Sequence, residues 1–270
     1  MTTTTLAAPT APPRQRRARS RGSRLSFLRR WISPVVLVGL WQLLSNAGVI
    51  PERKLVAPSQ VFATAVELVR NGTLGSETLV SVQRVFIGFA IGASVALVLA
   101  VVAGLSRIGD DAIDPPMQML RTLPHLGLVP LLIIWMGLGE TPKVTLISLG
   151  VAFPLYLNTL AGIRGIDRKT VEAARSMNLS WSQRIRHVIV PGALPQTLVG
   201  LRQSLGIAWL TLIVAETISA SSGIGYMINH ARDFLQTDVI VVGLAVYSIL
   251  GLLTDAVVRQ LERRALAWRS

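Results

Sequence analysis

Residues 85–106 read VFIGFAIGASVALVLAVVAGLS, a run of 22 positions without a charged side chain. An α-helix needs about 20 consecutive apolar residues to cross the hydrocarbon core of a bilayer. Inside lipid every backbone polar group must be satisfied by the segment itself or by a closed barrel. The stretch is therefore predicted to be a transmembrane helix, and the chain an integral membrane protein.

Other stretches of the chain have the same apolar character. His125 interrupts one of them and Arg202 another. With the run quoted above they make six predicted spans, at residues 31–51, 85–106, 122–139, 144–163, 198–215 and 239–258. The predicted fold class is thus all-α and integral to the membrane, with six transmembrane helices.

The composition supports this class. Of the 270 residues, 51% are hydrophobic and 15% are charged, whereas soluble domains carry roughly a quarter charged residues. A net charge of +13 could indicate a nucleic-acid partner, but the basic residues lie between the apolar runs, which favours membrane topology and no nucleic acid. The chain has no cysteine, which excludes disulfides and thiolate chemistry.

The distribution of basic residues predicts the orientation. With the N-terminus inside, 19 of the 27 Lys and Arg residues fall in cytoplasmic segments, six fall outside and two lie within spans. Loops rich in Lys and Arg stay in the cytoplasm. We therefore expect a multi-pass protein of the bacterial inner membrane with both termini cytoplasmic.

This topology predicts three parts: a basic arm at 1–30, a permease domain at 31–258 and a basic tail at 259–270. The arm contains no acidic residue and is predicted to be disordered to about residue 24. A twin-arginine signal or a transit peptide is the alternative for this arm. The tail is expected to rest on anionic membrane lipid.

Two predicted outer segments are too long to be simple turns. In residues 52–84, apolar side chains recur at helical spacing after Pro58 and Ser59, which predicts an interfacial helix with an N-cap there. Residues 217–237 contain the stretch SSGIG at 221–225. This segment either re-enters the membrane or forms a plain outer loop.

A polar loop at 164–191 connects the fourth and fifth predicted spans. Asp167 is suited to cap a helix start, because its carboxylate can accept from exposed N–H groups. Val171, Ala174 and Met177 then recur at helical spacing. Asn178 tolerates the left-handed backbone of a tight turn. A first short helix followed by a turn at Asn178 is the expectation.

A second helix should follow the turn. Ser180 and Gln183 fit a capping box, and Pro191 is expected to end this helix. In the first helix, Glu172 and Arg175 are spaced to pair on one face. The apolar residues expected to point inward from the second helix are Trp181, Ile185, Val188 and Ile189. Periodicity alone fits equally a partner-binding helix pair and a loop resting on lipid.

The loop resembles the coupling loop of ABC-importer permeases. The resemblance rests on Glu172-Ala173-Ala174, on the turn at Asn178, and on Val188, Val190 and Pro191. Asn178 departs from the glycine that this family usually has there. The resemblance implies an ABC importer type I permease fold whose 168–190 loop docks on a separate ATPase. It implies that the coupling residues are Glu172, Ala173, Ala174, Arg175, Met177, Asn178 and Pro191.

The resemblance covers about residues 31–268 and extends to the substrate class. The stretches QMLRTLPHL (118–126) and AETISASSGIGY (215–226) are similar to those of aliphatic sulfonate permeases. This implies import of aliphatic sulfonates for sulfur acquisition. Taurine, nitrate or another small anion or pyrimidine precursor remains the alternative substrate for the same importer class.

The family implies several partners: a permease homodimer, an ABC ATPase dimer and an extracytoplasmic substrate-binding protein. The chain has no Gly-x4-Gly-Lys-Ser/Thr phosphate loop. We therefore expect a non-catalytic subunit with no cofactor of its own, the ATPase binding ATP and Mg²⁺. Three scattered histidines give no metal-ligand spacing, so no metal site is expected.

Charged and polar residues inside predicted spans are costly unless they have a partner or a purpose. Arg121 and His125, four residues apart in the third predicted span, are the first candidates to line an anion pathway, and Glu216 is the third. A structural role is the alternative for each. A secondary anion transporter is the alternative from another class, but no inverted repeat is apparent between the two halves.

Overall fold

The computed structural model describes residues 23–51 and 55–269, which are helical with no strand among them. The chain divides into two compact units, residues 1–50 and 51–270. The first unit contains α1 (Ser23–Asn46), a helix with Pro34 inside it. The predicted N-terminal arm lies outside the described residues up to position 22, and α1 already begins before the predicted span at 31.

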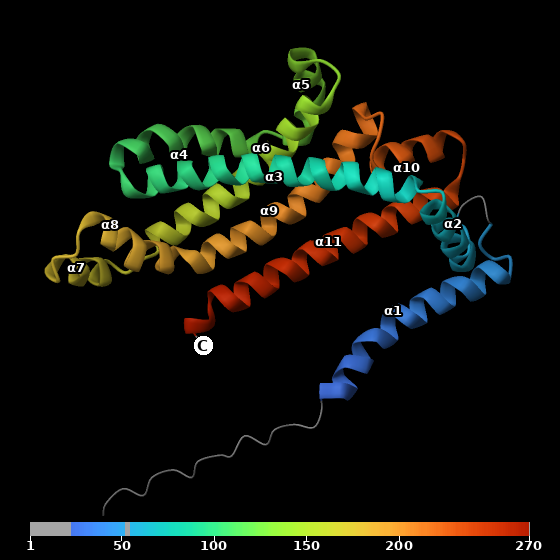
Figure 1. Ribbon diagram of the computed structural model, residues 1–270, viewed down its shortest axis with the longest axis horizontal. Helices are drawn as coiled ribbons and strands as arrows, with labels where there is room; N and C mark the ends of the chain where they lie inside the picture. Colours follow the sequence, from blue (N-terminus) through green and yellow to red (C-terminus); the bar gives the residue numbers. More distant parts are fainter. Residues whose placement is uncertain (1–22, 52–54, 270) are drawn as a thin grey trace, which may run out of the picture. The chain divides into compact units, whose positions relative to one another are not determined.

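The second unit contains every other described helix (Figure 1). In chain order these are α2 (Pro58–Arg70), α3 (Thr73–Leu105), α4 (Arg107–Thr122), η1 (His125–Leu128), α5 (Val129–Met136), α6 (Glu140–Arg164), α7 (Arg168–Ser176), α8 (Trp181–Arg184), η2 (Ile185–Ile189), α9 (Val190–Ser219), α10 (Ile224–Asp233), α11 (Thr237–Ala265) and η3 (Ala267–Arg269).

Four helical stretches of the described chain are long and apolar enough to cross a membrane, at 73–105, 140–164, 181–219 and 237–265. They contain the predicted spans 144–163, 198–215 and 239–258, and all of 85–106 except its last residue, Ser106, so these four spans are confirmed as helices of spanning length. The apolar part of α1, Ile32–Asn46, is shorter than a span. The count of six transmembrane helices stays a prediction.

The third predicted span, 122–139, is wrong as a single straight helix. The chain there forms α4 and then η1 with α5, and the two parts are bent by 85°. The break lies at Leu123, whose backbone is extended (φ −72°, ψ 135°). Leu123 precedes Pro124, and a proline sterically disfavours the helical conformation of the residue before it. Arg121 and His125 lie on opposite sides of this break, so they do not share one helix face.

The core of the second unit lies where α3, α6 and α9 pack together. Glycines allow the close approach: a Cβ added at Gly88 would lie 2.7 Å from Ile147 Cβ, and one at Gly92 would lie 2.9 Å from Ser148 Cα. The Ser148 hydroxyl donates to the Gly88 carbonyl at 3.0 Å. The Gly-x3-Gly pair of α3 thus serves helix packing, as its spacing indicates.

The second helix of the 164–191 loop continues into the next span. Together they form one helical stretch of 39 residues, Trp181–Ser219. The expectation that Pro191 ends a helix is wrong, because Pro191 lies in the first turn of α9. Proline lacks an N–H and its ring crowds the preceding turn of an α-helix. The π-helical turn η2 immediately before it widens the helix, and the helix continues through Pro191.

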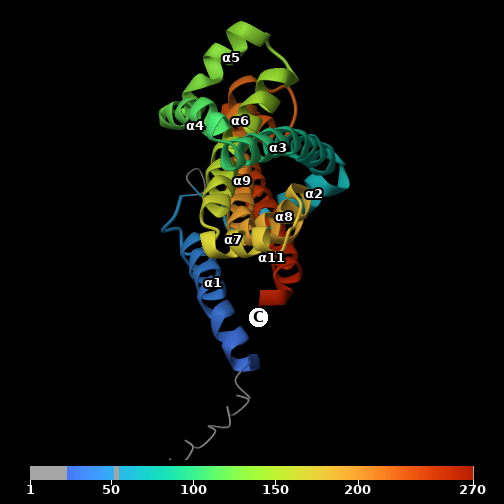
Figure 2. The same cartoon turned by 90° about the vertical axis from the view of Figure 1, so that its left-hand side faces the viewer.

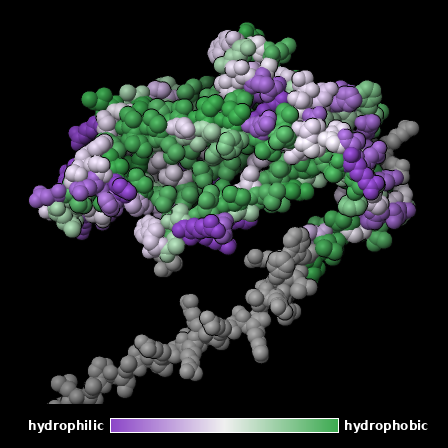
Figure 3. All heavy atoms as spheres, viewed as in Figure 1, coloured by the Kyte–Doolittle hydropathy of each residue, from purple (hydrophilic) through white to green (hydrophobic). Residues whose placement is uncertain are grey.

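Short helices lie at both ends of the long helices of the second unit. Figure 1 shows α7 and α8 at one end of the long helices, and α2 and α10 at the opposite end; Figure 2 views the molecule from the α7 and α8 end. In Figure 3 a broad hydrophobic band covers the visible face of the long helices, with hydrophilic residues toward the ends. This is the surface expected of a bundle surrounded by lipid.

Two smaller expectations concern the outer segments, 52–84 and 217–237. Helix α2 is present, but its N-cap is Ala57 and Pro58 begins the helix, so the predicted cap at Ser59 is wrong by two positions. Residues 224–233 form the short helix α10, too short to span. Whether segment 217–237 re-enters a membrane stays open.

Candidate functional site

The 164–191 loop folds as the helix, turn and helix that its sequence predicts. Asp167 caps α7, its side chain accepting from the Lys169 N–H at 3.0 Å. Asn178 adopts the left-handed conformation (φ 54°), and the Leu179 N–H donates to the Ala174 carbonyl at 3.2 Å. The turn that ends α7 is therefore closed by backbone hydrogen bonds.

The second helix begins with the predicted capping box. The Ser180 N–H donates to Gln183 Oε1 at 2.8 Å, and the Gln183 N–H donates to Ser180 Oγ at 3.3 Å. A cavity of about 250 Å³ separates this corner from the ends of α3 and α6, and Val171 and Ile189 line it. Arg175, Trp181 and Arg184 of the loop also line this cavity.

The tip of the loop is exposed. Ala174 is buried, whereas Glu172, Ala173 and Arg175 are exposed. Met177 is 74% exposed; Trp181 is 64% exposed, although it also lines the cavity against α3 and α6. No ion pair joins Glu172 to Arg175 within the described part of the chain. The tip therefore leaves apolar and charged surface exposed at Glu172, Met177 and Trp181.

A buried polar network lies at the other end of the long helices. Its centre is Glu216 of α9, whose side chain has no exposed surface. Glu216 accepts from Arg84 Nη1 at 2.6 Å, from the Ser81 hydroxyl at 2.8 Å and from the Tyr247 hydroxyl at 2.7 Å. It also accepts from the Gly225 N–H at 2.8 Å. Both of its oxygens are thus occupied by donors.

Arg84 extends this network to α6. Its guanidinium donates to both oxygens of Glu140, at 2.5 and 2.7 Å, a bidentate arrangement. Lys143, itself buried, donates to Glu140 at 3.0 Å. Two buried cations therefore balance two carboxylates, of which Glu216 is buried and Glu140 is exposed at the edge of the bundle.

The same network fixes the turn between α9 and α10. Arg84 Nη1 donates to the Ser222 carbonyl at 2.7 Å, and the Gly223 N–H donates to Glu77 Oε2. Gly223 has φ +102°, and a Cβ there would lie 2.5 Å from Arg84 Nη1. The glycine is required both by its backbone conformation and by this close approach. The network thus joins α3, α6, α9, α10 and α11.

Comparison with known proteins decides the family. Residues 62–266 match the family described as "Binding-protein-dependent transport system inner membrane component". The chain belongs to this family. It is therefore a transport permease: a multi-pass component of the inner membrane that works with a binding protein.

Two curated relatives come from Escherichia coli (strain K12). The aliphatic sulfonates transport permease protein SsuC is 50% identical over 238 residues, covering 88% of this chain and 90% of that protein. The taurine transport system permease protein TauC is 34% identical over 238 residues, covering 86% of each chain. A crystal structure of an amino acid ABC transporter matches with a TM-score of 0.62 at 19% identity, covering 74% of this chain and 97% of that one. The latter shows the fold alone.

The predicted pathway residues of this permease do not meet. Arg121 is exposed in the last turn of α4. His125 is half-buried, with its Nε2 atom 3.5 Å from the Thr211 hydroxyl of α9. Glu216 is enclosed by the buried network and lines no open path in this conformation. No hydrogen bond or ion pair joins any two of the three within the described residues.

Sequence reasoning missed the buried network almost entirely. Arg84 and Lys143 looked like basic residues flanking spans, and Glu216 looked like an isolated carboxylate. The partners are far apart in the chain: 132 positions separate Arg84 from Glu216. The available signal was that each charge directly borders a long apolar run, where an unpaired charge is costly.

Proposed function

We propose that this permease is the membrane subunit of an ATP-driven importer of aliphatic sulfonates. The supporting observation is the difference between its two relatives from one organism, 50% identity to the sulfonate permease against 34% to the taurine permease. The identity extends over nearly the whole chain and includes the spans. Taurine and nitrate remain the alternative substrates.

The exposed loop tip is the proposed docking site for an ABC ATPase. Met177 and Trp181 offer apolar surface, and Glu172 and Arg175 offer charge beside it. Aromatic, methionine and arginine side chains are enriched at protein interfaces. Ala173 and Ala174 keep the first helix of the loop narrow. Asn178 fixes the turn through its left-handed backbone, and Pro191 follows the π-helical turn η2. These are the proposed coupling residues.

The proposed assembly contains two copies of the permease, an ATPase dimer on the cytoplasmic side and a binding protein on the outer side. Both termini of the permease face the cytoplasm, as its basic residues indicate. ATP and Mg²⁺ belong to the ATPase, and the permease itself catalyses no reaction. The loop tip and the buried network then lie at opposite membrane faces.

The geometry suggests how motion at the tip reaches the outer face. The helical stretch from Trp181 to Ser219 has 39 residues and is about 58 Å long at 1.5 Å per residue. One end belongs to the docking loop, and the other carries Glu216. A shift of the ATPase that moves Trp181 is thereby transmitted to the joint of α3, α6, α10 and α11.

The proposed substrate is a permanent anion, and this bears on the pathway. Arg121 offers a guanidinium fork suited to a sulfonate, and it is exposed beside the break between α4 and η1. His125 follows directly after the break. Both are therefore retained as proposed pathway residues, whereas Glu216 is assigned to the buried joint.

Uptake into proteoliposomes tests this function. The permease is reconstituted with its ATPase and binding protein, and labelled alkanesulfonate uptake is measured with taurine or nitrate as competitors. ATP-dependent uptake that the competitors barely inhibit is the expected result. ATP-dependent uptake of taurine or nitrate alone would change the substrate and keep the mechanism. Uptake that needs no ATPase would indicate a secondary carrier instead.

The coupling loop is tested in the same vesicles. Glu172→Arg is expected to abolish uptake while the permease remains in the membrane. Glu67→Arg, the same change on an exposed residue of α2, is the matched control and should transport normally. Equal uptake by the two variants would contradict docking at the loop.

A further inference from the structure

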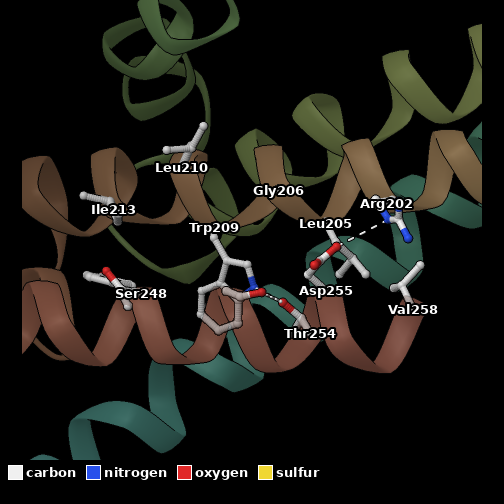
Figure 4. A pocket seen from close by; sticks show the side chains of 12 residues that line it. Arg202, Leu205, Gly206, Trp209, Leu210, Ile213, Ser248, Thr254, Asp255 and Val258 are labelled. Atoms are coloured by element: carbon white, nitrogen blue, oxygen red, sulfur yellow. Dashed lines mark hydrogen bonds and ion pairs between the residues drawn. The ribbon is translucent and has the colours of Figure 1, made fainter. Parts of the chain in front are cut away.

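A groove between α9 and α11 is not used by the proposed transport mechanism. It has a volume of about 430 Å³ and is lined along α9 by Leu205, Gly206, Trp209 and Ile213 (Figure 4). The indole N–H of Trp209 already donates to the Thr254 hydroxyl at 3.1 Å. The middle of the groove therefore offers apolar surface to an occupant.

Two glycines show that the groove is not filled by other residues of the second unit. A Cβ added at Gly206 or Gly251 would meet no atom within 4 Å. By contrast, a Cβ at Gly200, on the same helix, would lie 2.7 Å from Asn158 Cβ. The second unit therefore leaves open space on both helices of the groove, which an occupant from outside this unit can fill.

The groove has the length of one membrane leaflet. From Arg202 to Ile213 it follows α9 for 11 residues, or about 16 Å at 1.5 Å per residue. The hydrocarbon core of a bilayer is about 30 Å thick, so one leaflet contributes about 15 Å. An extended acyl chain therefore fits along it.

A basic hollow continues the groove at its Arg202 end. The hollow has a volume of about 430 Å³, and its lining includes Arg202, Arg259, Glu262 and Arg263. Arg202 is paired with Asp255 at 3.3 Å and with Glu262 at 2.8 Å. Arg259 is paired with the same Asp255 at 3.2 Å. Three arginines thus face two carboxylates, which leaves an excess of positive charge.

Arg263 supplies that excess. It is exposed, and it has no ion-pair partner within the described residues. A phosphate at this position would lie next to the mouth of the groove. The combination of an apolar slot one leaflet long and a cationic hollow at its end matches one ligand, a phospholipid with an anionic headgroup.

We propose that the α9–α11 groove binds an anionic phospholipid, one acyl chain lying along Gly206 and Gly251 and the phosphate lying at Arg263. The lipid belongs to the cytoplasmic leaflet, an assignment that rests on the topology of the proposed function. A transmembrane helix, either α1 or one from a second copy, is the competing occupant. The charge at the end of the groove favours the lipid.

Native mass spectrometry of the purified, detergent-extracted full-length permease tests this site. Phosphatidylglycerol and phosphatidylcholine with identical acyl chains are added separately, and the lipid-bound fraction is measured. The wild type is expected to retain phosphatidylglycerol preferentially. Because one arginine near an anionic surface contributes about 1 kcal/mol, Arg263→Gln should weaken phosphatidylglycerol binding about fivefold.

Matched controls separate the site from general charge and packing effects. Arg264→Gln removes the same charge one residue away, outside the hollow, and should leave retention unchanged. Gly251→Leu fills the groove and should abolish retention of both lipids. Gly75→Leu, at a glycine of α3 with equally open surroundings, should not.

Three results would overturn the lipid site: unchanged phosphatidylglycerol retention in Gly251→Leu, equal effects of Arg263→Gln and Arg264→Gln, or equal retention of the two lipids. A disulfide between cysteines placed at Gly251 and at Leu37 of α1 would also overturn it, by identifying a helix as the occupant. These readouts do not involve transport. Failure of the lipid site and failure of the importer proposal are therefore distinguishable.

Discussion

The loop tip and the buried network are connected by one 39-residue helical stretch, which begins at Trp181 and carries Glu216 near its other end. The two regions nevertheless place polar side chains in opposite environments. At the tip, Glu172 and Arg175 are exposed and unpaired within the described chain, and Met177 and Trp181 leave apolar surface uncovered. At the other end, Glu216 is enclosed by donors from three other helices, α3, α10 and α11. The tip therefore has capacity to bind a partner, whereas the network has its bonds complete and acts as a joint.

The largest expected effect is on the joint. Arg84→Gln removes the cation shared by Glu140 and Glu216 and leaves buried carboxylate charge unpaired. Breaking a buried ion pair from one side costs about 3–5 kcal/mol, so the thermal unfolding temperature of the purified permease should fall strongly. Arg70→Gln, at an exposed arginine of α2, is the control. If the two variants unfold at the same temperature, the network does not stabilise the bundle.

The next largest effect is on the tip, and it should leave stability unchanged. Trp181→Ala removes an exposed anchor, and loss of an interface hot spot costs about 2 kcal/mol or more, roughly a 30-fold weaker complex with the ATPase. Trp135→Ala serves as control, because Trp135 of α5 is 67% exposed and lies outside the loop. Affinity is measured by titrating labelled ATPase onto permease in nanodiscs. A lower unfolding temperature with unchanged affinity would reverse the roles assigned to the two regions.

Gly223 offers a smaller perturbation of the joint. At φ +102°, an alanine is strained and its Cβ meets Arg84, so Gly223→Ala should destabilise the permease by about 1–3 kcal/mol. Gly75→Ala, in the first turn of α3 with open space around it, should be neutral or stabilising. In denaturation experiments, Gly223→Ala is expected to lower the free energy of unfolding, whereas Gly75→Ala is expected to leave it unchanged or raise it. Equal effects would mean that the turn before α10 adapts freely.

The smallest expected effect concerns the turn at Asn178. A β-branched residue is disfavoured at φ 54°, so Asn178→Val should cost about 1–2 kcal/mol locally and reduce ATP-dependent uptake. Asn178→Gly should retain uptake, since glycine accepts the same backbone conformation. The two variants are compared in vesicles at equal protein content. Normal uptake by the valine variant would show that the turn geometry is not required.

Local chemistry predicted the loop well, because its caps and turn depend on residues close in sequence. Asp167, Asn178 and the Ser180–Gln183 box behave as expected. The predictions for two prolines were wrong, because the effect of a proline on a helix depends on the backbone around it. Pro124 broke a predicted span, whereas Pro191 was accommodated by a π-helical turn.

Long-range contacts were beyond sequence reasoning of this kind. The ion pair of Arg84 and Glu216 joins α3 to α9, and no spacing rule relates positions so distant. Four of the six spans predicted from the apolar runs lie in helices of spanning length, but the runs did not indicate which charged residues beside them would meet. Glu216 was consequently assigned to a pathway, although its side chain is fully enclosed.

A cross-linking measurement tests the contrast between the two regions most directly. The chain has no native cysteine, so Met177→Cys and Glu67→Cys each give a single thiol, one at the loop tip and one on α2 at the opposite end. A short thiol-to-amine cross-linker is added to the complete transporter in nanodiscs. We expect Met177→Cys to join the permease to the ATPase subunit and Glu67→Cys not to. An ATPase adduct at Glu67→Cys, with none at Met177→Cys, would contradict both the docking site and the orientation.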